Sequence, residues 1–79
     1  MTIRVYTKPA CMQCEMTKRA LTNEGLAFEL EDITDPMNLE AAKALGHTSA
    51  PVVVAGDESW AGFQPEKIKA LAERVKEAA

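Results

Sequence analysis

The sequence predicts a small α/β domain in which a strand–helix–strand unit is followed by a helix, a hairpin of two strands and a final helix. Three observations predict it: an alternating segment at Thr2–Tyr6 that leads into a helix, an apolar run at Val52–Ala55, and an amphipathic segment from Pro65. A 79-residue chain buries only about 60% of its unfolded surface, which suffices for one core. We therefore expect a single domain over residues 1–79.

The amino-terminal part predicts a βαβ unit. Thr7–Ala10, which contains a proline, interrupts the first strand, and a helix should begin at Cys11 or Met12. Asn23–Gly25 offers a stop, and Ala27–Leu30 then alternates apolar with charged residues as a second strand would. Because such crossovers are right-handed and make the strands parallel, the helix start should lie at the carboxyl end of the first strand.

The first helix is amphipathic on a helical wheel. One broad arc is apolar and contains Met12, Cys14, Met16, Ala20 and Leu21. Its polar arc contains Glu15, Lys18, Arg19 and Thr22. Cys11 lies on the polar side and Cys14 at the apolar margin, so the first cysteine should be the more exposed of the two.

A short second helix is predicted between Asp35 and Gly46. Asp35 suits an N-cap, Pro36 suits the first helical position, and Gly46 suits the position after the helix end. His47, the one histidine in the chain, follows in a loop. We expect it at the surface and assign it no catalytic role.

The carboxy-terminal part predicts a hairpin and a helix. After Ala50-Pro51, the run Val52–Ala55 is uniformly apolar, as expected of a strand that is buried on both faces. Gly56-Asp57 fits a two-residue turn into a last strand near Ser59–Ala61. The final helix begins at Pro65, and its buried face should contain Ile68, Leu71, Ala72 and Val75. The predicted order is βαβαββα.

Charge is divided unevenly along the chain. Residues 1–23 contain four basic and one acidic side chain, net +3, whereas residues 24–79 contain five basic and eleven acidic ones, net −6. The positive surroundings of the cysteines favour a thiolate. Overall acidity and the absence of a basic aromatic stripe argue against a nucleic-acid partner.

Cys11 and Cys14 are the only cysteines, and they point to redox chemistry. Residues three apart meet on one side of a helix, with Cβ atoms about 5–6 Å apart, so a disulfide can form without refolding the chain. A zinc site needs four ligands, and His47 is the only other imidazole or thiolate donor. Haem attachment requires histidine after the second cysteine, where Glu15 stands. We therefore expect neither metal nor cofactor.

A Cys-x-x-Cys motif at a strand-to-helix turn in a βαβ unit is typical of thioredoxin-like redox proteins. Cys11 should attack a partner disulfide, because the helix start favours its thiolate, and Cys14 should resolve the mixed disulfide. Lys8 is a candidate to stabilise that thiolate or steer a partner, and a solvated loop lysine is the alternative. Met12 and Gln13 should tune the reduction potential and contact the partner, unless they are merely exposed spacers.

Three segments together resemble the NrdH-redoxins, glutaredoxin-like electron donors to class Ib ribonucleotide reductase. They are Tyr6–Cys14, Ala50–Val53 and Trp60–Phe63, and the resemblance spans nearly the whole chain. It implies a thioredoxin fold: a four-stranded mixed sheet of order 2-1-3-4, flanked by three helices. It also implies a cis peptide bond before Pro51.

The resemblance further implies partner-binding roles. Ala50, before the proline, would offer backbone hydrogen bonds to an extended segment of the partner. Trp60, Gly62 and Phe63 would lie near the redox cleft and form part of an apolar partner surface, with core packing as the alternative for Phe63. The family usually reads Trp-Ser-Gly-Phe-Arg-Pro-Asp in this segment. This chain departs from that pattern at Ala61, Gln64 and Glu66, so the hydrogen-bond network of the family is expected to be weaker or rebuilt here.

The resemblance also names partners. Typical glutaredoxins hold the carboxylate of glutathione with a Gly-Gly-x-Asp-like segment, whereas this chain has Gly62–Pro65 in that place. Poor glutathione binding follows. Reduction by thioredoxin reductase, with NADPH as the distant electron source, and transfer to the large subunit of the ribonucleotide reductase are implied. A glutathione-dependent glutaredoxin is one alternative. The other is a redox-silent module that holds peptides on a partner-binding surface formed by Pro51 and Trp60.

The surroundings of the protein are also predicted. No apolar stretch approaches the roughly 20 residues of a membrane span, and the amino terminus shows no signal-peptide apolar region. We expect a cytoplasmic monomer without a membrane partner, in a compartment where structural disulfides are rare.

Overall fold

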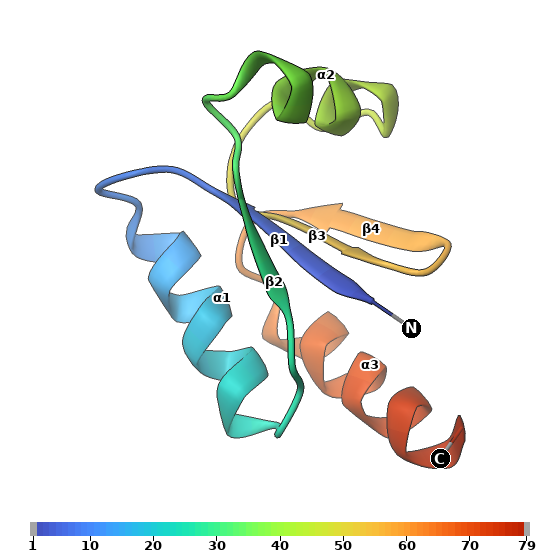
Figure 1. Cartoon of the computed structure of the whole chain (residues 1–79). Coiled ribbons are helices and arrows are strands. Elements are labelled where there is room, and N and C mark those ends of the chain that lie inside the picture. Colours follow the sequence, from blue (N-terminus) through green and yellow to red (C-terminus); the bar gives the residue numbers. More distant parts are fainter. Residues whose placement is uncertain (1, 79) are drawn as a thin grey trace.

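All the predicted elements are present, in the predicted order, in a computed structural model that describes residues 2–78 (Figure 1). The strands are β1 (Ile3–Thr7), β2 (Glu29–Asp32), β3 (Val52–Ala55) and β4 (Glu58–Ala61). The helices are α1 (Met12–Asn23), α2 (Pro36–Ala44) and α3 (Pro65–Ala78). The first strand starts one residue later than predicted and the second two residues later, while the two strands of the hairpin agree to within one residue.

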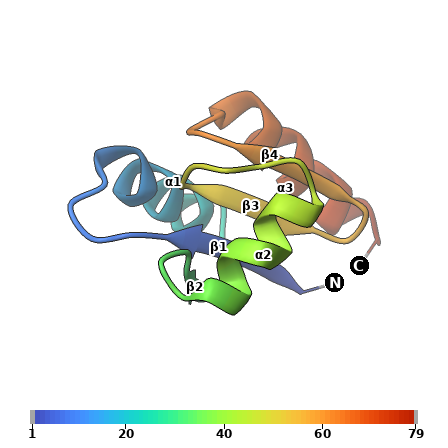
Figure 2. The ribbon, with the colours of Figure 1, turned by 90° about the horizontal axis from the view of Figure 1, so that it is seen from above.

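The four strands form one mixed sheet of order β2-β1-β3-β4. β1 pairs in parallel with β2 and antiparallel with β3, and β4 completes the hairpin with β3. Helices α1 and α3 cover one face and α2 covers the other, as Figures 1 and 2 show. This is the thioredoxin fold that was predicted.

The ends of α2 are fixed by local hydrogen bonds. The carboxylate of Asp35 accepts a backbone N–H two residues on at 2.9 Å, which is N-capping as predicted. At the other end Gly46 has φ +87°, and its N–H donates to the Lys43 carbonyl at 2.9 Å. The N–H of His47 donates to the Ala42 carbonyl at 3.0 Å, which completes a Schellman motif.

The larger core lies between the sheet and helices α1 and α3. It consists of Ile3, Val5, Leu21, Leu26, Val53, Ala55, Trp60, Ile68, Leu71 and Ala72. The predicted buried face of α3 is confirmed, with Val75 half-buried at its margin. A smaller core under α2 consists of Tyr6, Ile33, Ala42 and Val52.

The apolar arc of α1 does not coincide with its buried face. Met12 is 75% and Met16 is 40% exposed, whereas Thr17 is fully buried. The buried stripe of the helix is Cys14, Thr17 and Leu21, spaced three and four residues apart. Hydropathy alone missed this, because the sheet and α3 cover a narrow side of α1 and leave the methionine side open.

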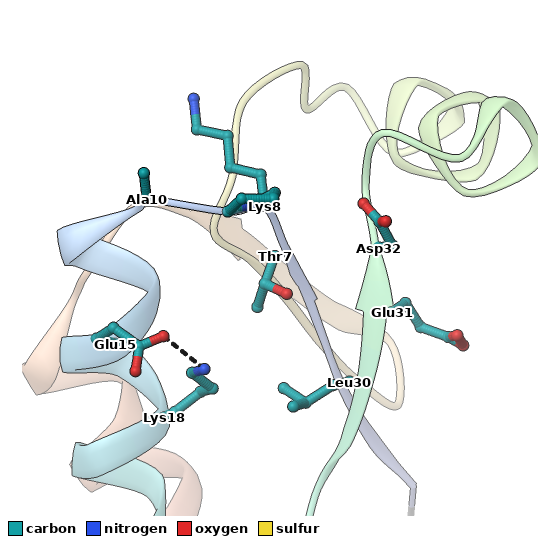
Figure 3. Close-up of a pocket in the computed structure, with 9 residues that line it drawn as sticks. Thr7, Lys8, Ala10, Glu15, Lys18, Leu30, Glu31 and Asp32 are labelled. Atoms are coloured by element: carbon teal, nitrogen blue, oxygen red, sulfur yellow. Dashed lines mark ion pairs between the residues drawn. The ribbon is translucent and has the colours of Figure 1, made fainter.

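Two further residues differ from expectation. Leu30, on the alternating second strand, is 52% exposed because β2 is an edge strand and the side chain lines the open hollow between β2 and α1 (Figure 3). His47 is half-buried rather than at the surface, and its Nε2 lies 3.0 Å from the hydroxyl of Ser59. Among the helices of residues 2–78, none is long and apolar enough to cross a membrane.

Leu71→Ala should lower the free energy of unfolding by about 2–5 kcal/mol, because the side chain is fully buried and its removal leaves a cavity. Urea unfolding followed by circular dichroism measures the change. Lys69→Ala, an exposed position on the same helix, should stay within about 0.5 kcal/mol of the unsubstituted protein. Equal midpoints for the Leu71 and Lys69 variants would contradict the assignment of the core.

Candidate active site

Cys11 and Cys14 are joined by a disulfide at the start of α1, with their Cα atoms 5.2 Å apart. Cys11 is the N-cap residue, with extended backbone angles, and Cys14 lies within the first turn. Cys11 is half-buried and Cys14 is fully buried. The predicted difference in exposure is therefore confirmed, and a large partner can reach only the sulfur of Cys11.

The sulfur of Cys11 takes the place of a capping oxygen. The backbone N–H of Cys14 donates to it at 3.1 Å. Backbone N–H groups at a helix start have no intrahelical acceptor and lie at the positive end of the helix dipole. When the disulfide is reduced, the same donor favours the thiolate form of Cys11.

The turn before Cys11 has an uncommon backbone. Ala10 has φ +56°, in the left-handed region that a side chain with a Cβ seldom adopts. Such a residue costs about 1–2 kcal/mol relative to right-handed backbone. This turn connects the end of β1 to α1.

The loop before β3 lies at the same end of the sheet. The Ala50-Pro51 peptide is cis, as the resemblance implied. Pro51 itself is fully buried, so its predicted place on a partner-binding surface is wrong. The carbonyl of Pro51 accepts the N–H of Gly62 at 2.8 Å. The backbone of Ala50, which is half-buried, forms no hydrogen bond with another residue in 2–78.

A side chain between the cysteines contacts the loop after β4. The Oε1 of Gln13 accepts the N–H of Phe63 at 3.2 Å. Gly62 has φ +83°, and a Cβ at this position would lie 3.5 Å from the same oxygen. Sequence reasoning missed this bond, because its partners are 50 residues apart and nothing local marks the pairing. Gln13 was a candidate because it lies between the cysteines, and Phe63 only through the resemblance.

Trp60 lies in the core and not, as was predicted, on a partner-binding surface. The resemblance implied that it forms part of an apolar partner surface, but its side chain is 2% exposed and belongs to the core. It pairs with Val53 in the β3–β4 ladder, on the face that α1 and α3 cover. Phe63 packs partly buried against the same core, which is the alternative role stated for it.

Two of the residues that depart from the family segment, Gln64 and Glu66, make favourable local interactions. The amide nitrogen of Gln64 donates to the carbonyl of Ala61 at 2.9 Å, which ties the end of β4 to the start of α3. Glu66 lies in the first turn of α3, where a negative charge is favourable. Gln64 thus makes a local hydrogen bond at the position where the family pattern has an arginine.

Two hollows flank the cysteine helix. The larger, about 450 Å³, lies between α1 and the end of β2 and is lined by Thr7, Lys8, Pro9, Ala10, Glu15, Lys18, Leu30, Glu31 and Asp32. Lys18 is paired with Glu15 at 2.5 Å, and the amino group of Lys8 points away from this pair (Figure 3). Lys8 therefore extends into solvent beside the redox motif.

The second hollow adjoins Cys11 directly. It has a volume of about 380 Å³ and is lined by Ala10, Cys11, Met12 and Glu15. With Met16 exposed one turn further along α1, Met12 makes the rim of this hollow apolar. Within residues 2–78, no group of three or more histidine, cysteine or acidic side chains could hold a metal ion.

A redox-competent cysteine pair at a helix start, beside a cis-proline loop on a thioredoxin fold, defines a thiol–disulfide oxidoreductase. The Glutaredoxin family model matches residues 3–60. The glutaredoxin-like protein NrdH of Escherichia coli K12 is 46% identical over 72 residues, covering 90% of this chain and 89% of that protein. The NrdH of Lactococcus lactis subsp. lactis is 35% identical over 71 residues, covering 89% and 99% respectively.

A solved structure agrees. NrdH-redoxin from Escherichia coli, described as a glutaredoxin-like protein with a thioredoxin-like activity profile, superposes with a TM-score of 0.83 at 46% identity. The match covers 90% of this chain and 95% of that one. The chain therefore belongs to the glutaredoxin-like NrdH proteins.

Asp32, in the wall of the larger hollow, offers a titration test. The hydroxyl of Thr34 at 2.6 Å and its N–H at 2.9 Å both donate to Oδ1, which lowers the pKa of Asp32 below 3.8. Thr34→Val removes the hydroxyl donor and should move that pKa up toward its ordinary value, as measured by NMR titration of the carboxyl carbon.

The sign of the linked effect on stability follows. A lowered folded-state pKa stabilises the protein above the unfolded-state pKa, and this contribution is lost as pH falls through the folded-state pKa. The stability gap between Thr34→Val and the unsubstituted protein should therefore narrow below about pH 4. Thr48→Val, at an exposed loop position, is the control and should leave the titration of Asp32 unchanged. If the pKa of Asp32 is the same in Thr34→Val as in the unsubstituted protein, the Thr34 hydroxyl is not the cause of the lowered pKa.

Proposed function

We propose that this protein is a dithiol–disulfide electron carrier between thioredoxin reductase and class Ib ribonucleotide reductase. Thioredoxin reductase, supplied by NADPH, reduces the Cys11–Cys14 disulfide. The dithiol then reduces a carboxy-terminal disulfide of the large subunit of the ribonucleotide reductase. The observation that carries the proposal is the unequal pair: a half-buried Cys11 sulfur that accepts a helix N–H, backed by a fully buried Cys14.

The pair supports a balanced two-electron exchange. The Cys11 thiolate attacks one sulfur of the partner disulfide, the partner S–S bond breaks, and the departing thiolate takes up a proton. The thiol of Cys14 then loses its proton and attacks Cys11, so the mixed disulfide breaks and the second partner thiolate leaves and is protonated. One of the two protons replaces the one lost by Cys14, and the other comes from solvent. The partner gains two electrons and two protons, and Cys11 and Cys14 end as a disulfide.

The surface around Cys11 supports a protein partner. Met12 offers an apolar, adaptable contact beside the attacking sulfur, and Lys8 offers a positive charge on the neighbouring loop. The unbonded backbone of Ala50 can pair with an extended segment of the partner, and Gly62 and Phe63 would border that segment. Trp60 and Pro51 act from the interior by fixing these loops.

Relatives that bear the NrdH name support the choice of electron acceptor, and the thioredoxin-like activity profile of the E. coli NrdH-redoxin supports the choice of reductase. The match to the Glutaredoxin family model favours a second candidate, a glutathione-dependent glutaredoxin. Against it, Gly62–Pro65 lacks the acidic residue that holds glutathione in typical glutaredoxins. We place the carrier in the cytoplasm as a monomer.

The two reducing systems separate these candidates. With insulin as the disulfide probe, NADPH and thioredoxin reductase should sustain turnover, while glutathione with glutathione reductase should be slower by about tenfold or more, the factor that one lost charged hydrogen bond implies. NADPH consumption at 340 nm measures both rates, and Cys11→Ser should abolish both. Rapid turnover with glutathione alone would assign the chain to the glutathione-dependent class.

Trapping tests the roles of the two sulfurs. Cys14→Ser should accumulate a mixed disulfide between Cys11 and the oxidised large subunit of class Ib ribonucleotide reductase, because no resolving thiol remains. Mass spectrometry of the non-reduced complex locates the linkage. Cys11→Ser should yield little adduct, because Cys14 is fully buried. No adduct from Cys14→Ser would favour a redox-silent peptide-binding module.

A further inference from the structure

One side-chain hydrogen bond connects the first turn of α1 to the neighbouring loops. Among residues 2–78, the bond between Gln13 Oε1 and the N–H of Phe63 is the one side-chain hydrogen bond that joins the cysteine segment to another element. Gln13 is two residues from Cys11, and Phe63 lies between β4 and α3. Packing of Leu21 against α3 holds the helix further down, away from the cysteines.

A second hydrogen bond connects this segment to the loop that contains the cis-proline. Gly62 precedes Phe63, and its N–H donates to the carbonyl of Pro51 at 2.8 Å. A Cβ on Gly62 would stand 3.5 Å from Gln13 Oε1, so the bare glycine lies directly beside the glutamine carbonyl. Two hydrogen bonds thus connect three segments in series, from the cysteine motif through Gly62-Phe63 to Pro51.

We propose that Gln13 is a positioning residue: its side-chain carbonyl holds Gly62-Phe63, and through them the loop at Ala50-Pro51, at a fixed place relative to the Cys11 sulfur. The inference rests on the proposed exchange reaction and names the residue that aligns a protein disulfide for it. Attack requires the thiolate and both partner sulfurs to lie nearly in line, and a misplacement of about 1 Å costs about 100-fold in rate. A small disulfide aligns itself, whereas a protein segment is aligned by the loops that it lies on.

The test is a pair of variants at one position. Gln13→Leu removes the acceptor at similar size, and Gln13→Glu keeps an acceptor oxygen at the same reach. The proteins are reduced beforehand with dithiothreitol and desalted, so no reductase enters the measurement. Stopped-flow rates are then taken with insulin and with the small disulfide 5,5′-dithiobis(2-nitrobenzoate).

With insulin, Gln13→Leu should react about tenfold more slowly, the factor that one neutral hydrogen bond supplies. With the small disulfide it should stay within about twofold, since that probe needs no loop for its alignment. Gln13→Glu should recover much of the insulin rate. The amide of Phe63 should exchange its hydrogen faster in Gln13→Leu than in Gln13→Glu, which reports the bond directly.

Gln64→Leu is the matched control, because it removes another glutamine hydrogen bond from the same loop without touching α1. It should leave the insulin rate near that of the unsubstituted protein. An equal loss in Gln64→Leu would assign the effect to loop stiffness and overturn the proposal. If Gln13→Leu lowers the rates with insulin and with the small disulfide equally, Gln13 acts on the reactivity of Cys11 and the proposal is overturned. An unchanged insulin rate in Gln13→Leu would overturn it as well. An unsubstituted protein that reduces neither probe would instead refute the proposed electron carrier.

Discussion

The register of the central strand β1 determines where the site forms. Tyr6 lies opposite Val52 of β3, and Val52 in turn lies opposite Ala61 of β4. The chain segments after Tyr6, before Val52 and after Ala61 therefore all lie at the same end of the sheet. They are the cysteine turn, the cis-proline loop and the Gly62-Phe63 segment, so backbone pairing in the sheet assembles a site from three distant stretches of sequence.

The same arrangement separates the environments of the two sulfurs. Because α1 packs on the sheet along Cys14, Thr17 and Leu21, the second cysteine is inside the protein and the first is at the edge. In the proposed exchange a partner would therefore meet the Cys11 sulfur first, so burial sets the expected order of the two steps. The capping hydrogen bond adds to this division, because the backbone N–H of Cys14 donates to the Cys11 sulfur.

Local signals predicted much of the fold. The cap at Asp35, the glycine at 46, the hairpin turn and the periodicity of α3 depend on neighbours in sequence, and each was found where expected. The predictions were wrong at Pro51 and Trp60, and the exposure of Met16 and Leu30 was not foreseen, because exposure depends on which distant element covers the position. Hydropathy describes a side chain and does not say which helix or strand packs over it. The bond between Gln13 and Phe63 lay beyond sequence reasoning for the same reason, since it exists only once β4 is paired in the sheet.

The contact of Gln13 with Gly62-Phe63 has a consequence for protein engineering. A Cys-Met-Gln-Cys spacer grafted onto another thioredoxin-fold scaffold would bring the glutamine carbonyl without the amide that it accepts. Gly62 also has φ +83°, which a host residue with a Cβ would rarely adopt, so the loop itself would have to change. The transplantable unit is therefore discontinuous: the spacer and the loop after β4 form one cassette and should be moved together.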